Sequence, residues 1–248
     1  MKMIEDLSLN AWPSYQMQVY DGWILRFSYF YTHRTNCAEQ IGASTLPLGE
    51  KIRYAEEVYR KWRSPTVFKI SPVGDPALDS LLEAGGYRIE HATTVMTRSF
   101  AESPACREGN AGCELLLRDR VDDEWIRALF ALKGETPDIH RKIVPKMYDA
   151  IPMDEIAVSA VSGGKVIGTG LGILDRGYVG VYAIHVDSAH RRRGIASQIV
   201  GTILSEAEKK GAGAAYLQVV SDNAAAKALY RTYGFRDSYR YYFRVKGI

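Results

Sequence analysis

The order of apolar segments constrains the fold of this 248-residue chain more than any other feature. The second half ends as helix, strand, helix and strand, at residues 194–210, 214–220, 223–235 and 239–246. The first half ends in the same order, at residues 50–62, 66–71, 75–87 and 90–98. The last helix of each half leaves through a glycine and an aromatic residue, at Gly86-Tyr87 and at Gly234-Phe235. This recurrence predicts a duplicated fold of the α/β (α+β) class.

The segments before the second of these runs carry further helix and strand signals. Residues 123–134 have apolar side chains at helical spacing, and residues 178–186 have the composition of a buried strand. Two β-branched runs flank Ser162-Gly163-Gly164-Lys165, which indicates a hairpin. If the halves are related, the long run at 20–36 is expected to correspond to the strand at 178–186.

A small, polar segment with glycine and proline, residues 99–113, separates the two halves. It predicts a linker between an N-terminal domain at 1–98 and a C-terminal domain at 114–248. Each of these is long enough to bury a core of its own.

Composition and charge limit the class of protein. With 46% hydrophobic and 25% charged residues, the chain is typical of a globular protein. A net charge of +3 is too small to indicate a nucleic acid or an anionic membrane as partner. The start is polar and acidic, unlike a signal peptide, and no apolar run reaches the roughly 18 residues of a membrane span. A cytoplasmic location is therefore expected, and a homodimer stays open.

The cysteines and histidines show no pattern of a metal site. The chain has three cysteines, Cys37, Cys106 and Cys113, an odd number that favours reduced thiols. No Cys/His pair has the spacing of metal ligands, so no metal is expected.

A basic loop, "HRRRGIASQI" at 190–199, lies between a predicted strand and a predicted helix. Such a loop presents unpaired backbone N–H groups and the positive end of the helix dipole, which together bind anions. Gly194 allows close approach of a ligand, and the arginines add charge-assisted hydrogen bonds. Neither a P-loop nor a G-x-G-x-x-G fingerprint is present. Taken alone, the loop fits a phosphate site and a solvated charge cluster equally well.

The surrounding residues resemble the GNAT superfamily of acyl-CoA-dependent N-acyltransferases. The resemblance rests on an R-x-x-G-x-A loop between strand and helix, Arg191 to Ala196, and on the later Leu229-Tyr230-x-x-x-Gly-Phe helix end. It covers roughly residues 115–245. The whole chain resembles the tandem GNAT proteins, in which a divergent first half precedes the functional second half. The resemblance implies a mixed, mostly antiparallel central sheet flanked by helices, with no cofactor loop in the first half.

The resemblance also implies acetyl-CoA (coenzyme A) as cofactor and assigns the residues that bind it. The loop would hold the pyrophosphate through Arg191, Arg192, Arg193, Gly194, Ile195, Ala196 and Ser197. The preceding strand is expected to splay from its neighbour and to pair with pantetheine through Ile184, His185 and Val186. Asn223 matches the family's asparagine that contacts the cofactor arm, and Tyr230 matches the tyrosine beside the sulfur.

Three residues are expected to carry the chemistry. Tyr230 would protonate the departing thiolate, because a phenol with pKa ~10 is protonated at neutral pH. The N–H of Ile184 would face the thioester carbonyl as an oxyanion donor. The glutamate that many members use as base is absent, and Gly180 stands at its place. Strict alternation puts Tyr182 toward the substrate and on the same face as Ile184, with His185 on the opposite face.

The leading hypothesis is an enzyme that transfers acetyl from acetyl-CoA to a primary amine by direct attack in a ternary complex. A non-catalytic coenzyme A sensor or interaction protein is the alternative, and a nucleic-acid binder is disfavoured because acidic residues follow the loop. The acceptor stays open among a drug, a polyamine, an amino acid and a peptide N-terminus. Residues 29–36 of the first half are expected to help form its site.

Overall fold

The structure, a computed structural model, describes residues 1–102 and 111–247. More than half of the predicted linker at 99–113 lies outside these residues. The first half contains α1 (Lys2–Ala11), β1 (Gln16–Tyr20), β2 (Trp23–Phe27), the short 3-10 helix η1 (His33–Thr35), β3 (Ala38–Gln40), α2 (Leu48–Lys61), β4 (Thr66–Ile70), α3 (Pro76–Ala84) and β5 (Arg88–Ser99).

The second half contains β6 (Glu114–Arg118), α4 (Asp123–Lys133), α5 (Asp138–Asp149), β7 (Asp154–Ser162), β8 (Lys165–Asp175), β9 (Tyr178–Val186), η2 (Ser188–His190), α6 (Ile195–Lys209), β10 (Ala214–Val220), α7 (Ala224–Thr232) and β11 (Arg236–Lys246). The helices, strands and hairpin predicted for this half are confirmed, apart from up to three residues at some ends. The sequence reasoning missed α1, α5, β1 and β6. Among the described residues, no helix is long and apolar enough to cross a membrane.

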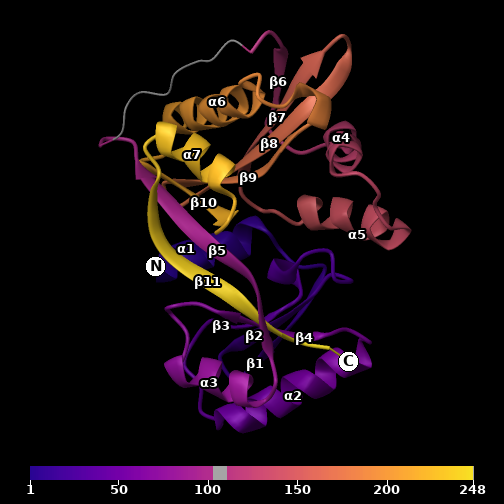
Figure 1. The fold of residues 1–248 in the computed structure, drawn as a ribbon, viewed down its shortest axis with the longest axis vertical. Coiled ribbons are helices and arrows are strands. Elements are labelled where there is room, and N and C mark those ends of the chain that lie inside the picture. The colour runs from indigo at the N-terminus through magenta and orange to yellow at the C-terminus, as the bar shows by residue number, and fades with distance from the viewer. Residues whose placement is uncertain (103–110, 248) are drawn as a thin grey trace.

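One sheet of eleven strands runs through the molecule, in the order β1-β2-β3-β4-β11-β5-β10-β9-β8-β7-β6. Within the described residues only the β3–β4 and β9–β10 pairs are parallel. The predicted fold class, a mixed and mostly antiparallel sheet flanked by helices, is therefore confirmed (Figure 1).

The same layout occurs twice. In the first half β2, β3 and β4 are neighbours, and α2 connects the parallel pair β3 and β4. In the second half β8, β9 and β10 repeat this arrangement, and α6 connects β9 to β10. The expected duplication is thus present in the topology. The predicted correspondence of residues 20–36 with β9 is wrong, because the three-residue strand β3 occupies that place.

The two units exchange their last strands. β11, from the end of the chain, lies between β4 and β5, while β5 pairs with both β11 and β10. In Figure 1 β5 and β11 run side by side along the middle of the molecule and join its upper and lower parts. The sheet consequently does not divide where the chain was expected to divide, at residues 99–113.

Three glycines on β8 set the position of α6. Gly168, Gly170 and Gly172 share one face of the strand because side chains alternate along it. A Cβ at Gly170 would lie 2.3 Å from Cγ2 of Ile199, and one at Gly172 would lie 2.7 Å from Cγ2 of Ile203. Glycine therefore lets α6 pack directly against the sheet, which fixes the N-terminus of this helix beside the end of β9.

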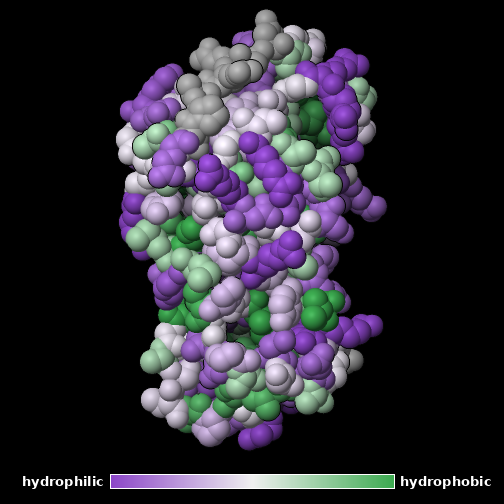
Figure 2. All heavy atoms as spheres, turned by 60° about the vertical axis from the view of Figure 1, so that its left-hand side comes forward, coloured by the Kyte–Doolittle hydropathy of each residue, from purple (hydrophilic) through white to green (hydrophobic). Residues whose placement is uncertain are grey.

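The surface seen in Figure 2 mixes hydrophilic and hydrophobic residues in small patches. No broad apolar area is visible on the part of this face that the described residues form. The large apolar side chains instead fill buried clusters on the sheet.

Candidate active site

The basic loop forms one wall of a pocket between α6 and α7. Gly194 begins α6 with φ +83°, a left-handed conformation that glycine adopts without strain. The pocket is lined by Val186, His190, Arg191, Arg192, Gly194, Ile195, Ala196, Ser197, Ala225, Ala226, Ala228 and Leu229. Most of the residues predicted to bind the pyrophosphate therefore lie together at the start of a helix. Arg193 follows in the same loop and is exposed.

The loop is positively charged, and hydrogen bonds hold it in place. No acidic side chain of the described residues forms an ion pair with the three arginines. Asp187 instead accepts a hydrogen bond from His190 Nδ1 at 2.7 Å and caps η2. The hydroxyl of Tyr233 donates to the backbone oxygen of Ser197 at 2.6 Å. These contacts order the loop and leave its guanidinium groups available to an anion.

The strand before the loop separates from its neighbour, as predicted. β9 and β10 are paired only from Tyr178–Val181 and Ala214–Leu217, although both strands continue beyond these residues. The second part of β9, which contains Ile184, His185 and Val186, consequently has no strand partner on its β10 side. Such an edge offers backbone groups to an extended ligand.

A β-bulge in β9 overturns the predicted faces. Thr169 is opposite His185 and Leu171 is opposite Tyr182, so β9 has one extra residue there, and Ala183 takes φ +50°. A bulge resets the alternation of side chains. Ile184 therefore points toward α6, where its Cδ1 would lie 2.8 Å from a Cβ at Gly170. Tyr182 and His185 share the other face, so the expectation that Ile184 lies with Tyr182 and His185 opposite is wrong.

A second pocket lies on that other face, between the two halves of the chain. From the second half it is lined by Leu129, Lys133, Tyr148, Leu171, Tyr182, Ala183, His185 and Gln218. From the first half it is lined by Ser8, Leu9, Ala11, Trp12, Arg26, Tyr31, Thr32, Arg34, Glu39 and Lys69. The segment 29–36 thus contributes to a pocket that neither half forms alone.

Basic groups, among them Arg34 and Lys133, line this second pocket. Nε of Arg34 donates to the Tyr241 hydroxyl at 2.7 Å, and Nζ of Lys133 donates to the Tyr31 hydroxyl at the same distance. Within the described residues neither Arg34 nor Lys133 has a carboxylate at ion-pair distance. Burial, together with the charges of Lys133 and Arg191, lowers the pKa of His185 to about 4, so its ring is neutral at pH 7.

The inner end of the pocket holds a buried ion-pair network. Nζ of Lys69 contacts the carboxylates of Glu5 and Glu39, the latter at 3.3 Å. Burial disfavours the charged lysine, but the two carboxylates outweigh it and raise the pKa of Lys69. Burial raises the pKa of the neighbouring Cys37 thiol to about 12. Lys69 is therefore charged and the Cys37 thiol is neutral near neutral pH. No local pattern in the sequence indicates this network, because its members come from α1, β3 and β4.

Tyr182 is a hydrogen-bonding group rather than a base. Its hydroxyl lies 2.6 Å from that of Tyr216, and burial raises its pKa well above 10. It consequently stays protonated at neutral pH and can donate to, or accept from, a group in the pocket.

Tyr230 and Asn223 lie on α7, beside the first pocket. Tyr230 is 9% exposed, packs against Phe235 and belongs to the core cluster under α6. Burial raises its pKa to about 12, so the phenol is protonated. The side chain of Asn223 caps α7 by accepting from the N–H of Ala226 at 3.0 Å. Neither side chain lines either pocket, although their neighbours Leu229 and Ala225 line the first one.

The sequence matches a known family over almost its whole length. Residues 1–244 match the family described as "Probable histone acetyltransferase Rv0428c C-terminal". The chain belongs to this family. It is a GNAT N-acetyltransferase of the tandem type, as the resemblance implied.

Individual relatives agree with this assignment. The chain is 25% identical to the uncharacterized N-acetyltransferase YobR of Bacillus subtilis over 246 residues, 99% of this chain and 98% of YobR. It is 34% identical to the N-alpha-acetyltransferase RimI of Mycobacterium tuberculosis over 132 residues, 51% of this chain and 72% of RimI. A GCN5-related N-acetyltransferase from Kribbella flavida has the same fold, with a TM-score of 0.72 at 15% identity, and the match covers 99% of this chain and 95% of that one.

The two pockets of this GNAT protein meet at one strand. Val186 lines the pocket at the basic loop and His185 lines the pocket between the halves, so they face opposite sides of β9 near its end. A ligand that follows the free edge of β9 can therefore reach from one pocket to the other.

Proposed function

We propose that this enzyme transfers the acetyl group of acetyl-CoA to a primary amine, with coenzyme A at the basic loop and the amine in the pocket between the halves. The observation that carries the proposal is the meeting of the two pockets at β9. The free edge of that strand joins an anion-binding helix start to a pocket with room for a second molecule.

The basic loop fits the pyrophosphate of coenzyme A. The backbone N–H groups of Ile195, Ala196 and Ser197 stand in the first turn of α6, where no helical partner is available. Arg191, Arg192 and Arg193 supply charge. When bound there, acetyl-CoA supplies a thioester whose carbonyl carbon an amine attacks directly, which gives an amide and the coenzyme A thiol.

The chain's own groups would then act at three points. The N–H of Ile184, at the bulge, would donate to the thioester oxygen. Tyr230, which stays protonated, would give its proton to the sulfur as the C–S bond breaks. The neutral ring of His185 and the hydroxyl of Tyr182 face the acceptor pocket and would orient the amine. The amine nitrogen loses its proton to solvent, because none of these groups titrates as a base near pH 7.

We further propose that the acceptor carries an acidic group beside its amine. Arg34 and Lys133 repel an ammonium ion and attract a carboxylate, and in a partly buried pocket these charges act at a lower dielectric constant than in water. The rings of Trp12, Tyr31 and Tyr148 form an apolar wall against which the rest of the acceptor would pack. Free amino acids and acidic peptide N-termini fit this description better than polyamines.

The experiment is coenzyme A thiol release with amines in matched pairs that differ by one carboxylate, such as tyrosine with tyramine and arginine with agmatine. We expect faster release with the acid of each pair, and a smaller difference in Arg34→Gln. Binding of acetyl-CoA without release for any amine would instead support a non-catalytic sensor. Absence of acetyl-CoA binding would contradict the proposed function, whereas equal rates within each pair would contradict only the acidic acceptor.

A further inference from the structure

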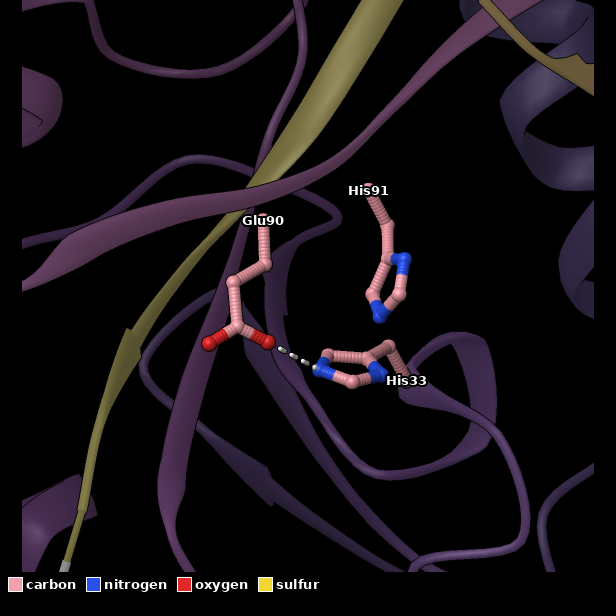
Figure 3. Close-up of side chains that lie close together, drawn as sticks. All are labelled: His33, Glu90 and His91. Atoms are coloured by element: carbon pink, nitrogen blue, oxygen red, sulfur yellow. Dashed lines mark ion pairs between the residues drawn. The ribbon is translucent and has the colours of Figure 1, made fainter. Parts of the chain in front are cut away.

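We propose that His33, Glu90 and His91 form a binding site for a divalent transition-metal ion such as Zn²⁺. Figure 3 shows the three side chains converging, His33 from η1 and the other two from β5. One ligand atom from each residue lies within 4.8 Å of the others. The site is separate from both pockets, because none of its residues lines either of them.

A β-bulge brings Glu90 and His91 to the same side of the sheet. Consecutive residues of a regular strand point to opposite faces. In β5 the register against β11 jumps from Thr93 opposite Tyr241 to Glu90 opposite Phe243, which leaves one extra residue in β5. His91 sits in this bulge with φ +51°. This left-handed backbone conformation is energetically unfavourable for histidine, and residues held in such conformations are concentrated at functional sites.

The ring of His33 has a buried nitrogen without a hydrogen bond. Nε2 of His33 lies 3.3 Å from Oε2 of Glu90, yet the geometry between them is not that of a hydrogen bond. Two ligands that are each about 2.1 Å from a tetrahedral zinc ion stand roughly 3.4 Å apart. The His33–Glu90 separation therefore already matches shared coordination, and the exposed His91 offers a third ligand atom within 4.8 Å of the other two.

The surroundings hold the ring of His33 in place. Phe30 and Phe243 pack against this ring, with centroids 5.2 Å and 5.3 Å away. Two imidazole nitrogens and one carboxylate oxygen favour Zn²⁺, Co²⁺ or Ni²⁺ over Mg²⁺ and Ca²⁺.

The site adjoins the acceptor pocket through η1. Arg34 follows His33 directly, lines the pocket and donates a hydrogen bond to the Tyr241 hydroxyl. A bound ion would tie η1 to β5 and so stiffen the segment that carries Arg34. The metal is therefore placed to support the pocket rather than to touch the reacting atoms.

The test is titration of the full-length, chelator-treated protein with Zn²⁺ by calorimetry and with Co²⁺ by visible absorption. We expect one ion per chain, a rise in melting temperature with Zn²⁺, and Co²⁺ d–d bands typical of a nitrogen- and oxygen-ligated ion. His91→Asn is the principal variant, because asparagine tolerates the left-handed backbone and lacks the imidazole. It should keep the fold and lose the binding, as should Glu90→Gln.

His140→Ala is the matched control, since it removes a histidine whose Nε2 is bonded to the backbone oxygen of Tyr29, outside the cluster. It should bind the ion as the unchanged protein does. Binding that persists in His91→Asn, or that disappears in His140→Ala as well, would overturn the proposed site. Absence of any stoichiometric binding would overturn it too. Each readout is independent of acetyl transfer.

Discussion

At the scale of single residues, three groups that line the proposed acceptor pocket, Tyr31, Tyr182 and His185, hold one protonation state around neutral pH. Burial lowers the pKa of His185 to about 4 and raises that of Tyr31 to about 12. The pKa of Tyr182 is raised well above 10 by burial and by its contact with Tyr216. These three groups are thus neutral over this range of pH, and the amine itself is the group expected to titrate.

The pH dependence of the reaction should therefore follow the acceptor. Because only the neutral amine attacks, kcat/KM should rise about tenfold per pH unit from about pH 6 until the amine's own pKa is reached. His185 is deprotonated throughout this range, so its titration adds no inflection. Acceptors with less basic amines should shift the whole profile downward in pH. An inflection near pH 6.5 shared by all acceptors would show that the enzyme supplies a base.

Tyr230→Phe should lower kcat by ~10²–10⁴ while the fold and the acetyl-CoA affinity change little, because one positioned general acid is lost and the ring still packs. Tyr233→Phe is the matched control, at the residue that ends the same helix. It removes the hydroxyl that bonds Ser197, so it should weaken acetyl-CoA binding more than it lowers kcat. Single-turnover rates and melting temperatures of both variants separate these effects. A loss of kcat below about threefold in Tyr230→Phe would rule out its role as acid.

At the scale of elements, the packing of α6 against β8 determines the position of the basic loop. The glycines of β8 let the isoleucines of α6 approach the strand, and the loop begins where that helix begins. A shift of α6 would move the backbone N–H groups of its first turn away from β9.

Gly170→Ala should consequently reduce both stability and acetyl-CoA affinity. Its new Cβ would lie 2.3 Å from a side-chain atom of Ile199, and overpacking of this kind typically costs about 1–3 kcal/mol. Gly213→Ala is the control, because a Cβ there meets nothing within 4 Å and should cost less than about 0.5 kcal/mol. Urea unfolding and calorimetry with acetyl-CoA give both quantities. Equal stability of the two variants would contradict this account of the packing.

At the scale of the whole molecule, the exchanged strands make one body out of two repeated units. β11 brings Tyr241, Phe243 and Val245 into the core of the first half. Arg244, 4% exposed, pairs with Asp79 at 2.7 Å. The acceptor pocket exists only where the halves meet.

The chain should therefore unfold in a single transition, and its halves should not fold alone. Residues 1–98 without β11 would expose an edge of β4 and an apolar surface, so that fragment is expected to be unfolded or aggregated. Co-expression of 1–98 with 114–248 should restore a soluble complex. Circular dichroism and urea titration check this, and a cooperative transition in either isolated fragment would contradict it.

The sequence by itself determined the features that depend on neighbours along the chain. Helix and strand periods placed β7 to β11 and α6, and the glycine and arginines of the basic loop indicated an anion site at a helix start. The motif from Arg191 to Ala196, together with the later Leu229-Tyr230-x-x-x-Gly-Phe helix end, indicated the GNAT family. These signals are local, because a helix start and a strand are each encoded by a few consecutive residues.

Only the tertiary structure decided which strands pair and which side chains meet. Two bulges, at Ala183 and His91, each add one residue and reverse the faces that alternation predicts. The exchange of β5 and β11 joins the two halves, between which the proposed acceptor pocket lies. Two side-chain clusters also bring together residues that are distant in the chain. They are the Glu5–Lys69–Glu39 network and the His33–Glu90–His91 cluster. Pairings of this kind depend on the energy of long-range packing, which no single segment of the sequence contains.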